Sequence, residues 1–225
     1  MLLVAVALSL SVGSSASLYN TAVSAGSFTG SRTAPSSGGI TEVGNYDNIS
    51  LSWTILPETA SLYRYTYTFA NFVPPAISHF ILELSDNCTA TGECFRSTSS
   101  NIEFGTFGPQ ASNPNFPAGQ SIKGVKFEFG SATPAIYTFL SNRIPVWGNF
   151  YIKGGSNNDT GNNFGRAYNN ALALSGFNSE SVTDFIARPD TIRIPSNETG
   201  IPEPATYALI GSALVIVAML RRRKS

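Results

Sequence analysis

The chain has 225 residues and a formal net charge of zero, because 14 lysines and arginines balance 14 aspartates and glutamates. Charged residues make up only 12% of the chain, about half the share usual in soluble domains, so nucleic acid is not an expected partner. The 20 glycines, 13 prolines, 15 phenylalanines and 9 tyrosines, against a single histidine, indicate a loop-rich β protein rather than a helical one.

The N-terminus has the pattern of an export signal. Residues 1–12 are mostly apolar and carry no charged side chain, and the residues that follow have small side chains. This is the arrangement of a signal-peptide core and its cleavage zone. We expect a signal peptide over residues 1–16, with Ser14 and Ala16 at the positions that a signal peptidase accepts; Val23 and Ala25 form a weaker alternative. Basic residues normally precede such a core, so either the true translation start lies upstream or the signal is a weak one.

The central region, residues 17–198, has the two-residue periodicity of half-buried β-strands. Residues 62–69 place four aromatic side chains on one face and Arg64 with two threonines on the other. Further strands are expected at residues 49–56, 78–84, 125–129, 136–140, 149–153 and 192–194. Short strands separated by turn residues predict a mainly β body, an antiparallel β-sandwich of jelly-roll type. Helices should be few, with one short candidate at residues 166–174.

The two cysteines, Cys88 and Cys94, lie in the polar segment DNCTATGEC. An exported protein matures in an oxidising compartment, so these cysteines are expected to form a disulfide that closes a small loop. A metal site would need two further Cys or His ligands that the chain does not supply nearby, and a redox pair normally reads Cys-x-x-Cys.

Catalytic groups are sparse. His79 is the single histidine, and its neighbour Ser78 points to the other face of the same strand, so the two cannot act as base and nucleophile. We expect His79 to be a partly exposed strand residue. The acidic residues that could form a hydrolytic pair are spread over several segments: Glu83, Glu103, Glu128, Asp184 and Asp190. The sequence therefore predicts no enzyme, no cofactor and no metal site, although a triad with a distant serine stays open.

The aromatic residues are the remaining place for a binding site. Exposed rings can act as flat platforms for sugars, and Trp53, Tyr63, Tyr65, Tyr67 and Trp147 are the candidates. A row of tyrosines on one strand face more often packs into the core, with each hydroxyl bonded at its edge. If these rings are buried, they pack the core; if they are exposed, they can form a sugar-binding platform.

The C-terminus carries three features in a fixed order. Residues 201–225 read IPEPATYALIGSALVIVAMLRRRKS. The uncharged run 205–220 would form a helix of about 24 Å, slightly shorter than a hydrocarbon core of about 30 Å, so it could just span a membrane. The basic cluster that follows, Arg221, Arg222, Arg223 and Lys224, would stop transfer on the cytoplasmic side, which leaves the body outside.

A Pro-Glu-Pro tripeptide, a hydrophobic helix and a basic tail together resemble the sorting signal of the PEP-CTERM family, whose members are substrates of the membrane protease-transpeptidase exosortase. The resemblance covers about 25 of the 225 residues. It implies that Pro202, Glu203 and Pro204 are the recognition motif and that Arg221 to Arg223 anchor the tail. Exosortase would cut near the tripeptide and transfer the body to the outer surface or an extracellular matrix. The segments ISHFILELSDNC and RIPVWGNFYIKGG also resemble bodies of that family.

These features predict a non-enzymatic, exported cell-surface or matrix protein that is anchored in the inner membrane before processing. Its expected partners are the membrane, an exosortase-type protease and, in one alternative, an exopolysaccharide. That alternative is a carbohydrate-binding module in the matrix, and a third hypothesis is a secreted hydrolase.

Overall fold

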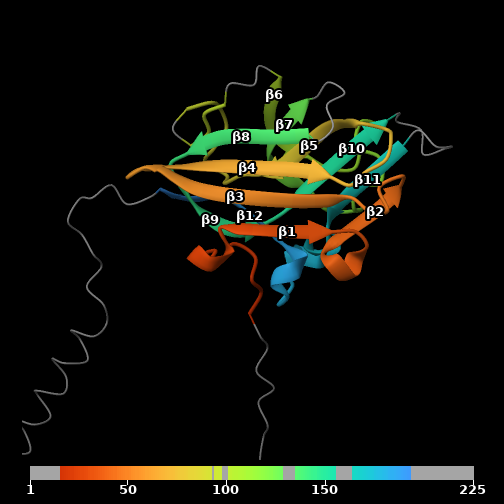
Figure 1. Ribbon diagram of the computed structural model, residues 1–225, viewed down its shortest axis with the longest axis horizontal. Helices are drawn as coiled ribbons and strands as arrows, with labels where there is room; N and C mark the ends of the chain where they lie inside the picture. The colour runs from red at the N-terminus through yellow and green to blue at the C-terminus, as the bar shows by residue number, and fades with distance from the viewer. Residues whose placement is uncertain (1–15, 93, 98–100, 129–134, 156–163, 194–225) are drawn as a thin grey trace, which may run out of the picture. The chain divides into compact units, whose positions relative to one another are not determined.

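The computed structural model describes residues 16–92, 94–97, 101–128, 135–155 and 164–193. Within these residues the chain forms twelve β-strands and five 3-10 helices, and no α-helix. All strand pairs are antiparallel, and the sheets pack together, so the body is mainly β as predicted (Figure 1). This body belongs to a compact unit of residues 1–194, whereas residues 195–225 form a second unit that lies outside the described residues.

One sheet has four strands in the order β1-β3-β4-β8. They are β1 (Thr29–Thr33), β3 (Ser50–Thr59), β4 (Leu62–Ala70) and β8 (Ala135–Ser141). The alternation read in the sequence decides which face is buried: Tyr65, Tyr67 and Phe69 of β4 have no exposed surface, whereas Arg64 is exposed. The strands predicted at residues 49–56, 62–69 and 136–140 are confirmed.

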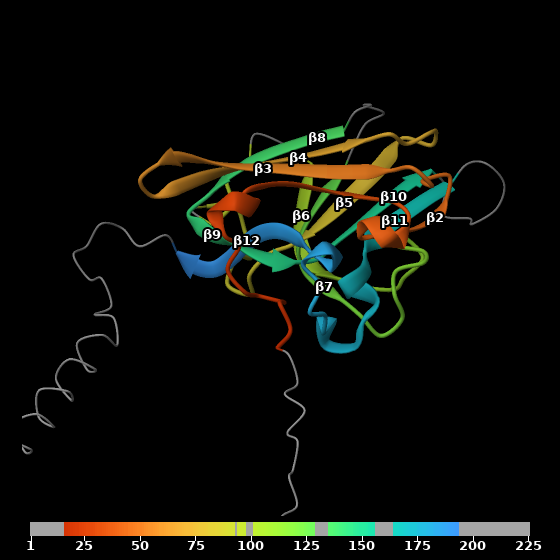
Figure 2. The same cartoon turned by 60° about the horizontal axis from the view of Figure 1, so that its bottom comes forward.

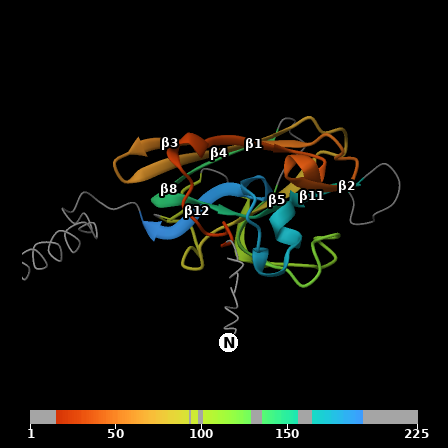
Figure 3. The same cartoon turned by 90° about the horizontal axis from the view of Figure 1, so that it is seen from below.

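The second sheet has six strands in the order β2-β11-β10-β5-β7-β6. They are β2 (Ile40–Gly44), β11 (Phe164–Asn169), β10 (Phe150–Gly155), β5 (Ile77–Glu83), β7 (Ile122–Glu128) and β6 (Ile102–Phe107). Figure 2 shows β3, β4 and β8 as a layer above β5, β10 and β11, and Figure 3 shows the same two layers from another side. The strands predicted at residues 78–84 and 149–153 are confirmed, as is the described part of the one at 125–129.

The core between the two sheets is aromatic. Phe80 of β5 stacks on Phe127 of β7 with ring centroids 5.5 Å apart, and it meets Tyr137 of the opposite sheet at 4.9 Å. Tyr65 stacks on Phe139 at 5.3 Å within the four-stranded sheet. Large rings bury much apolar area per residue, so a body with 15 phenylalanines needs few helices to form a core.

The six-stranded sheet is covered on its second face as well. Ile81, Phe107, Ile122 and Tyr151 point away from the main core and form a smaller cluster, which also holds Phe116 and Leu172 from the connecting segments. His79 lies on this covered face and is only 4% exposed. The expectation of a partly exposed histidine is therefore wrong, because the loops 108–121 and 170–184 contribute residues that pack over the strand.

The predicted helix at residues 166–174 is also wrong. Residues 166–169 belong to strand β11, and only Asn170–Ala173 form a single 3-10 turn, η3. Two further turns follow, η4 (Ser175–Phe177) and η5 (Val182–Asp184), while η1 (Ala25–Ser27) and η2 (Ser36–Gly38) lie near the N-terminus.

A third, small sheet joins both ends of the body. Strand β9 (Arg143–Gly148) pairs with β12 (Ile186–Arg193), which confirms the described part of the strand predicted at residues 192–194. On the other side of β9 lies the N-terminal segment, residues 17–23: the amides of Asn20 and Val23 donate to carbonyls of β9 at 3.0 Å. The beginning and the end of the described chain therefore meet on one strand.

The predicted signal peptide lies outside the described residues, except for Ala16, and so does the whole C-terminal tail. In the part of the chain that is described, no helix has the length and apolar character needed to cross a membrane.

Candidate functional site

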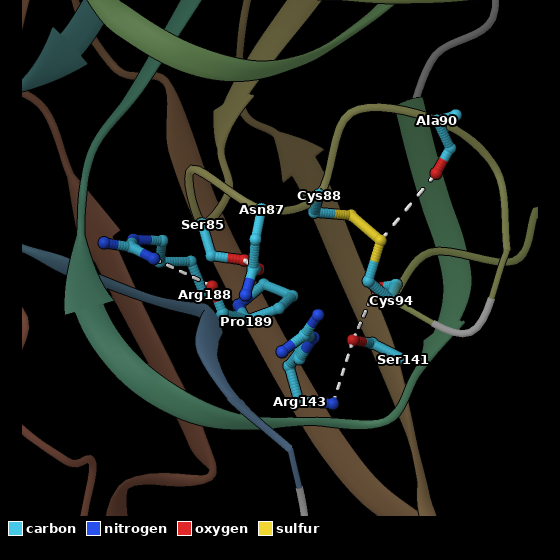
Figure 4. Close-up of a disulfide and its surroundings, with 9 residues drawn as sticks. All are labelled: Ser85, Asn87, Cys88, Ala90, Cys94, Ser141, Arg143, Arg188 and Pro189. Carbon is cyan, nitrogen blue, oxygen red and sulfur yellow. Dashed lines mark hydrogen bonds between the residues drawn. A yellow bond between two sulfur atoms is a disulfide. The ribbon is translucent and has the colours of Figure 1, made fainter.

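The predicted disulfide between Cys88 and Cys94 is confirmed (Figure 4). It closes a loop that follows β5 and contacts the turn between β8 and β9. The hydroxyl of Ser141 donates to the Cys94 carbonyl at 2.7 Å and accepts from the Arg143 amide at 3.1 Å. Because Arg96 also exchanges two backbone hydrogen bonds with Leu140, the loop is held along the end of β8.

A buried carboxylate lies beside this loop. Glu83, at the end of β5, is 5% exposed. Its Oε2 accepts hydrogen bonds from the amide and the side-chain nitrogen of Asn149, both at 2.8 Å. Its Oε1 accepts from the Arg188 guanidinium at 3.2 Å and from the Tyr19 hydroxyl. Four donors thus surround the carboxylate, so its hydrogen-bonding capacity is met inside the protein.

The partner of Glu83, Arg188, is held by the backbone around it. Arg188 also donates to the Pro189 carbonyl at 2.8 Å and to Asn20 of the N-terminal segment. Its side chain crosses Gly148 so closely that a Cβ there would lie 2.2 Å from Nε. Only glycine leaves room for the arginine at this point. A larger residue at position 148 of β9 would displace the Arg188 side chain from Glu83.

A small polar pocket of about 80 Å³ lies at this network. It is lined by residues that include Tyr19, Glu83, Arg188 and Asp190. Its volume suits a few water molecules. Burial, and then the charge of Glu83, raise the pKa of the Tyr19 hydroxyl, so this group stays protonated and acts as a donor. Glu83 is already saturated with donors, and two further carboxylates, Asp86 and Asp190, also line the pocket.

A row of basic residues lies on the covered face of the six-stranded sheet. Arg166, Lys153 and His79 occupy paired positions on β11, β10 and β5, and all three are buried. Burial, followed by the charges of Lys153, Lys126 and Arg166, lowers the pKa of His79 to about 3, although a hydrogen bond with Asn113 opposes the shift. The imidazole is therefore neutral near pH 7 and a very weak base.

Two of the acidic residues considered for hydrolysis, Glu83 and Asp190, line the same polar pocket, whereas the other three are bound to partners elsewhere. Glu103 and Glu128 both bind Lys126, at 2.6 and 3.0 Å. Asp184 accepts from Asn170 at 3.0 Å and from Ser179 at 2.5 Å. Among the residues that the structure describes, no group of three or more His, Cys, Asp or Glu side chains is placed to hold a metal ion.

The candidate aromatic platform belongs to the core. Trp53, Tyr65, Tyr67 and Trp147 are buried, and Tyr63 is half-buried. The Tyr65 and Tyr67 hydroxyls donate to the carbonyls of Arg143 and Ala187, both at 2.8 Å, so their polar ends are satisfied inside the protein. The sugar-platform interpretation is therefore wrong for the four buried rings, whose strand faces point into the molecule.

The two tryptophans enclose a basic residue that the sequence did not single out. The guanidinium of Arg32 lies 4.9 Å from the ring centroid of Trp53 and 5.8 Å from that of Trp147. Its Nε donates to the Phe185 carbonyl at 2.9 Å. Burial lowers the pKa of Arg32 to about 10, against the opposing charge of Asp184. Arg32 stays charged at neutral pH, and it ties β1 to the segment that leads into β12.

The sorting residues expected from the sequence lie outside the described residues. These are Pro202, Glu203, Pro204, Arg221, Arg222, Arg223 and Lys224. Comparison of the chain with protein-family models, with curated proteins and with solved structures finds no match.

Proposed function

We propose that this protein is a non-enzymatic, exported cell-surface or matrix protein that is sorted by its C-terminal tail. One observation carries the proposal: residues 201–225 combine Pro-Glu-Pro, an uncharged run of helix length and a basic cluster in this order. Pro202 and Pro204 disfavour a helix and so would keep Glu203 in an extended segment outside the membrane, where a processing enzyme could bind it.

Two features of the body support the proposal, one its export and the other its non-enzymatic character. The Cys88–Cys94 disulfide is of the kind that persists in oxidising compartments. The polar groups that could carry chemistry are committed to the fold, since Glu83 accepts four hydrogen bonds and burial makes His79 a weak base. Both features fit a non-enzymatic exported protein better than they fit a secreted hydrolase.

The N-terminal segment supports signal cleavage after Ala16. Residues 17–23 pair with β9, Tyr19 binds Glu83, and Val23 is buried in the core. Cleavage after Ala25 would remove this whole segment. We therefore propose that the mature protein begins at Ser17.

We also propose that the two sheets form a β-sandwich of jelly-roll type. The support is that consecutive strands repeatedly change sheets, from β2 to β3, from β4 to β5 and from β7 to β8. Long connections between two packed antiparallel sheets are typical of such folds.

Membrane fractionation in a host that carries an exosortase tests the sorting proposal. Wild type should leave the inner-membrane fraction, whereas Glu203→Ala should stay there because the recognition motif is lost. Glu180→Ala, which changes an exposed glutamate of the body, should behave as wild type. Retention of all three proteins in the inner membrane would reduce the tail to an ordinary anchor.

A further inference from the structure

The outward face of the four-stranded sheet carries a row of threonines. Thr29, Thr54, Thr66 and Thr138 are paired in register across β1, β3, β4 and β8. Directly opposed residues lie on the same face of a sheet, so the four side chains form one line across it. Neighbouring strands are about 4.8 Å apart, which gives the line a length of roughly 14 Å.

A second hydroxyl row runs parallel to the first. Ser31, Ser52 and Thr68 are paired across β1, β3 and β4, and the row ends at Ile136 of β8, which is 58% exposed. Every position in the threonine row and in this second row is exposed or half-buried. In Figure 2 this face is the side of β3, β4 and β8 turned away from β5 and β10.

The two rows contain no charged side chain. The next row on the same face holds Arg64, whose charge is neutralised by Glu58 through contacts of 2.6 and 2.9 Å. The half-buried arginine of β1, Arg32, belongs to the opposite face and packs on Trp53. A neutral surface of hydroxyl and methyl groups offers no positive charge to a phosphate or a carboxylate, but its hydroxyls can pair with an uncharged partner that is itself rich in hydroxyls.

We propose that this face binds a neutral polysaccharide laid along the threonine row. Each threonine supplies one donor and two acceptors for sugar hydroxyls, and its methyl group can contact the CH surface of a sugar ring. Hydroxyls on this face already bond to one another, as Thr66 and Thr138 do at 3.2 Å, so part of the row is ordered before a ligand arrives.

The twist of the sheet favours a single chain over a flat lattice. Adjacent strands rotate by about 20–25° relative to one another, so four strands cannot match a planar crystalline surface over their whole area. A flexible linear polymer can follow one twisted row. Each contact replaces a contact with water and contributes little, so binding should be weak for short oligomers and should strengthen with chain length.

Serines and threonines are also frequent on solvated sheets because they suit the strand conformation. The test therefore uses valine, which keeps the β-branched shape and removes only the hydroxyl. This inference rests on the sheet face and not on the sorting signal, so either one can fail while the other stands.

Affinity electrophoresis of the full-length chain in mild nonionic detergent tests the inference. The native gels contain hydroxyethylcellulose, laminarin or galactomannan as neutral polymers, or alginate as an anionic one. Wild type should be retarded by at least one neutral polymer and not by alginate. The double variant Thr54→Val/Thr66→Val should bind that polymer at least about fivefold more weakly, because two hydrogen-bonding groups are lost.

Two further variants complete the design. Thr106→Val removes an exposed hydroxyl from β6 of the other sheet and should bind as wild type does. Thr29→Val/Thr138→Val changes the exposed ends of the row, and it replaces the first double variant if that one unfolds early. Migration of wild type unchanged by every neutral polymer, retardation by alginate alone, or equal retardation of wild type and a folded double variant would each overturn the inference.

Discussion

At the scale of single residues, the body buries charged and titratable groups that are more often left in water. Glu83 and Arg188 form an ion pair in which both side chains are almost fully buried. Removing one partner of a buried pair is costly, because the other keeps its charge without compensation.

Glu83→Gln should lower the free energy of unfolding by about 3–5 kcal/mol, since Arg188 would lose its counter-ion. The comparison is Glu128→Gln, which removes a half-exposed carboxylate bound to Lys126 and should cost about 1 kcal/mol or less. Urea unfolding of the full-length chain in detergent measures both values. Equal losses in the two variants would show that the Glu83 network is not a stabilising feature.

His79 should make stability depend on pH. The unfolded state binds a proton near pH 6.5, whereas the folded state keeps the imidazole neutral down to about pH 3. Stability contributed by the neutral histidine is therefore complete above pH 6.5 and declines as the pH falls, by up to about 1.4 kcal/mol per pH unit. Wild type should lose more stability between pH 6.5 and pH 4 than His79→Gln, as measured by urea unfolding at each pH. Parallel curves for the two proteins would contradict the assignment.

At the scale of elements, the disulfide holds a loop rather than a strand. The bridge closes a sequence separation of six residues, so it constrains the unfolded chain only modestly. Replacing both cysteines by alanine should cost about 2 kcal/mol of unfolding free energy. Denaturant unfolding of the variant, beside wild type with and without reductant, measures the loss. A variant as stable as oxidised wild type would mean that the Ser141 and Arg96 contacts suffice to hold the loop.

Strands with one polar face could be predicted well from the sequence. In residues 62–69 the two faces differ sharply in polarity, and the period-2 pattern predicts both the element and its buried side. The six-stranded sheet was harder, because both of its faces are covered. Ile81 sits on the face assigned to solvent, and an apolar residue there was the available sign that something packs over β5.

Contacts between residues far apart in the sequence could not be predicted from the local pattern of apolar and polar residues. Residues 166–174 lack clear alternation, and they become a strand and a 3-10 turn because β11 is placed between β2 and β10. Arg166, Lys153 and Arg188 are spaced like surface charges in the sequence, and only the register of distant strands buries them. The Glu83 network joins residues from positions 19 to 188, which no local signal connects.

At the scale of the whole molecule, the N-terminal segment and β12 both pair with β9, and each leads toward a predicted targeting segment. This arrangement explains why the two proposed cleavage events would leave the body intact. A cut after Ala16 spares the segment that pairs with β9, and a cut near Glu203 lies beyond β12, which ends at Arg193.

The intact mass of the protein recovered from an exosortase-carrying host shows whether the C-terminal tail is a processed sorting signal. We expect a product that begins at Ser17 and has lost the hydrophobic run and the basic tail after the Pro-Glu-Pro motif, whereas Glu203→Ala keeps its C-terminus. A wild-type mass that still includes the residues up to Ser225 would contradict sorting by this tail.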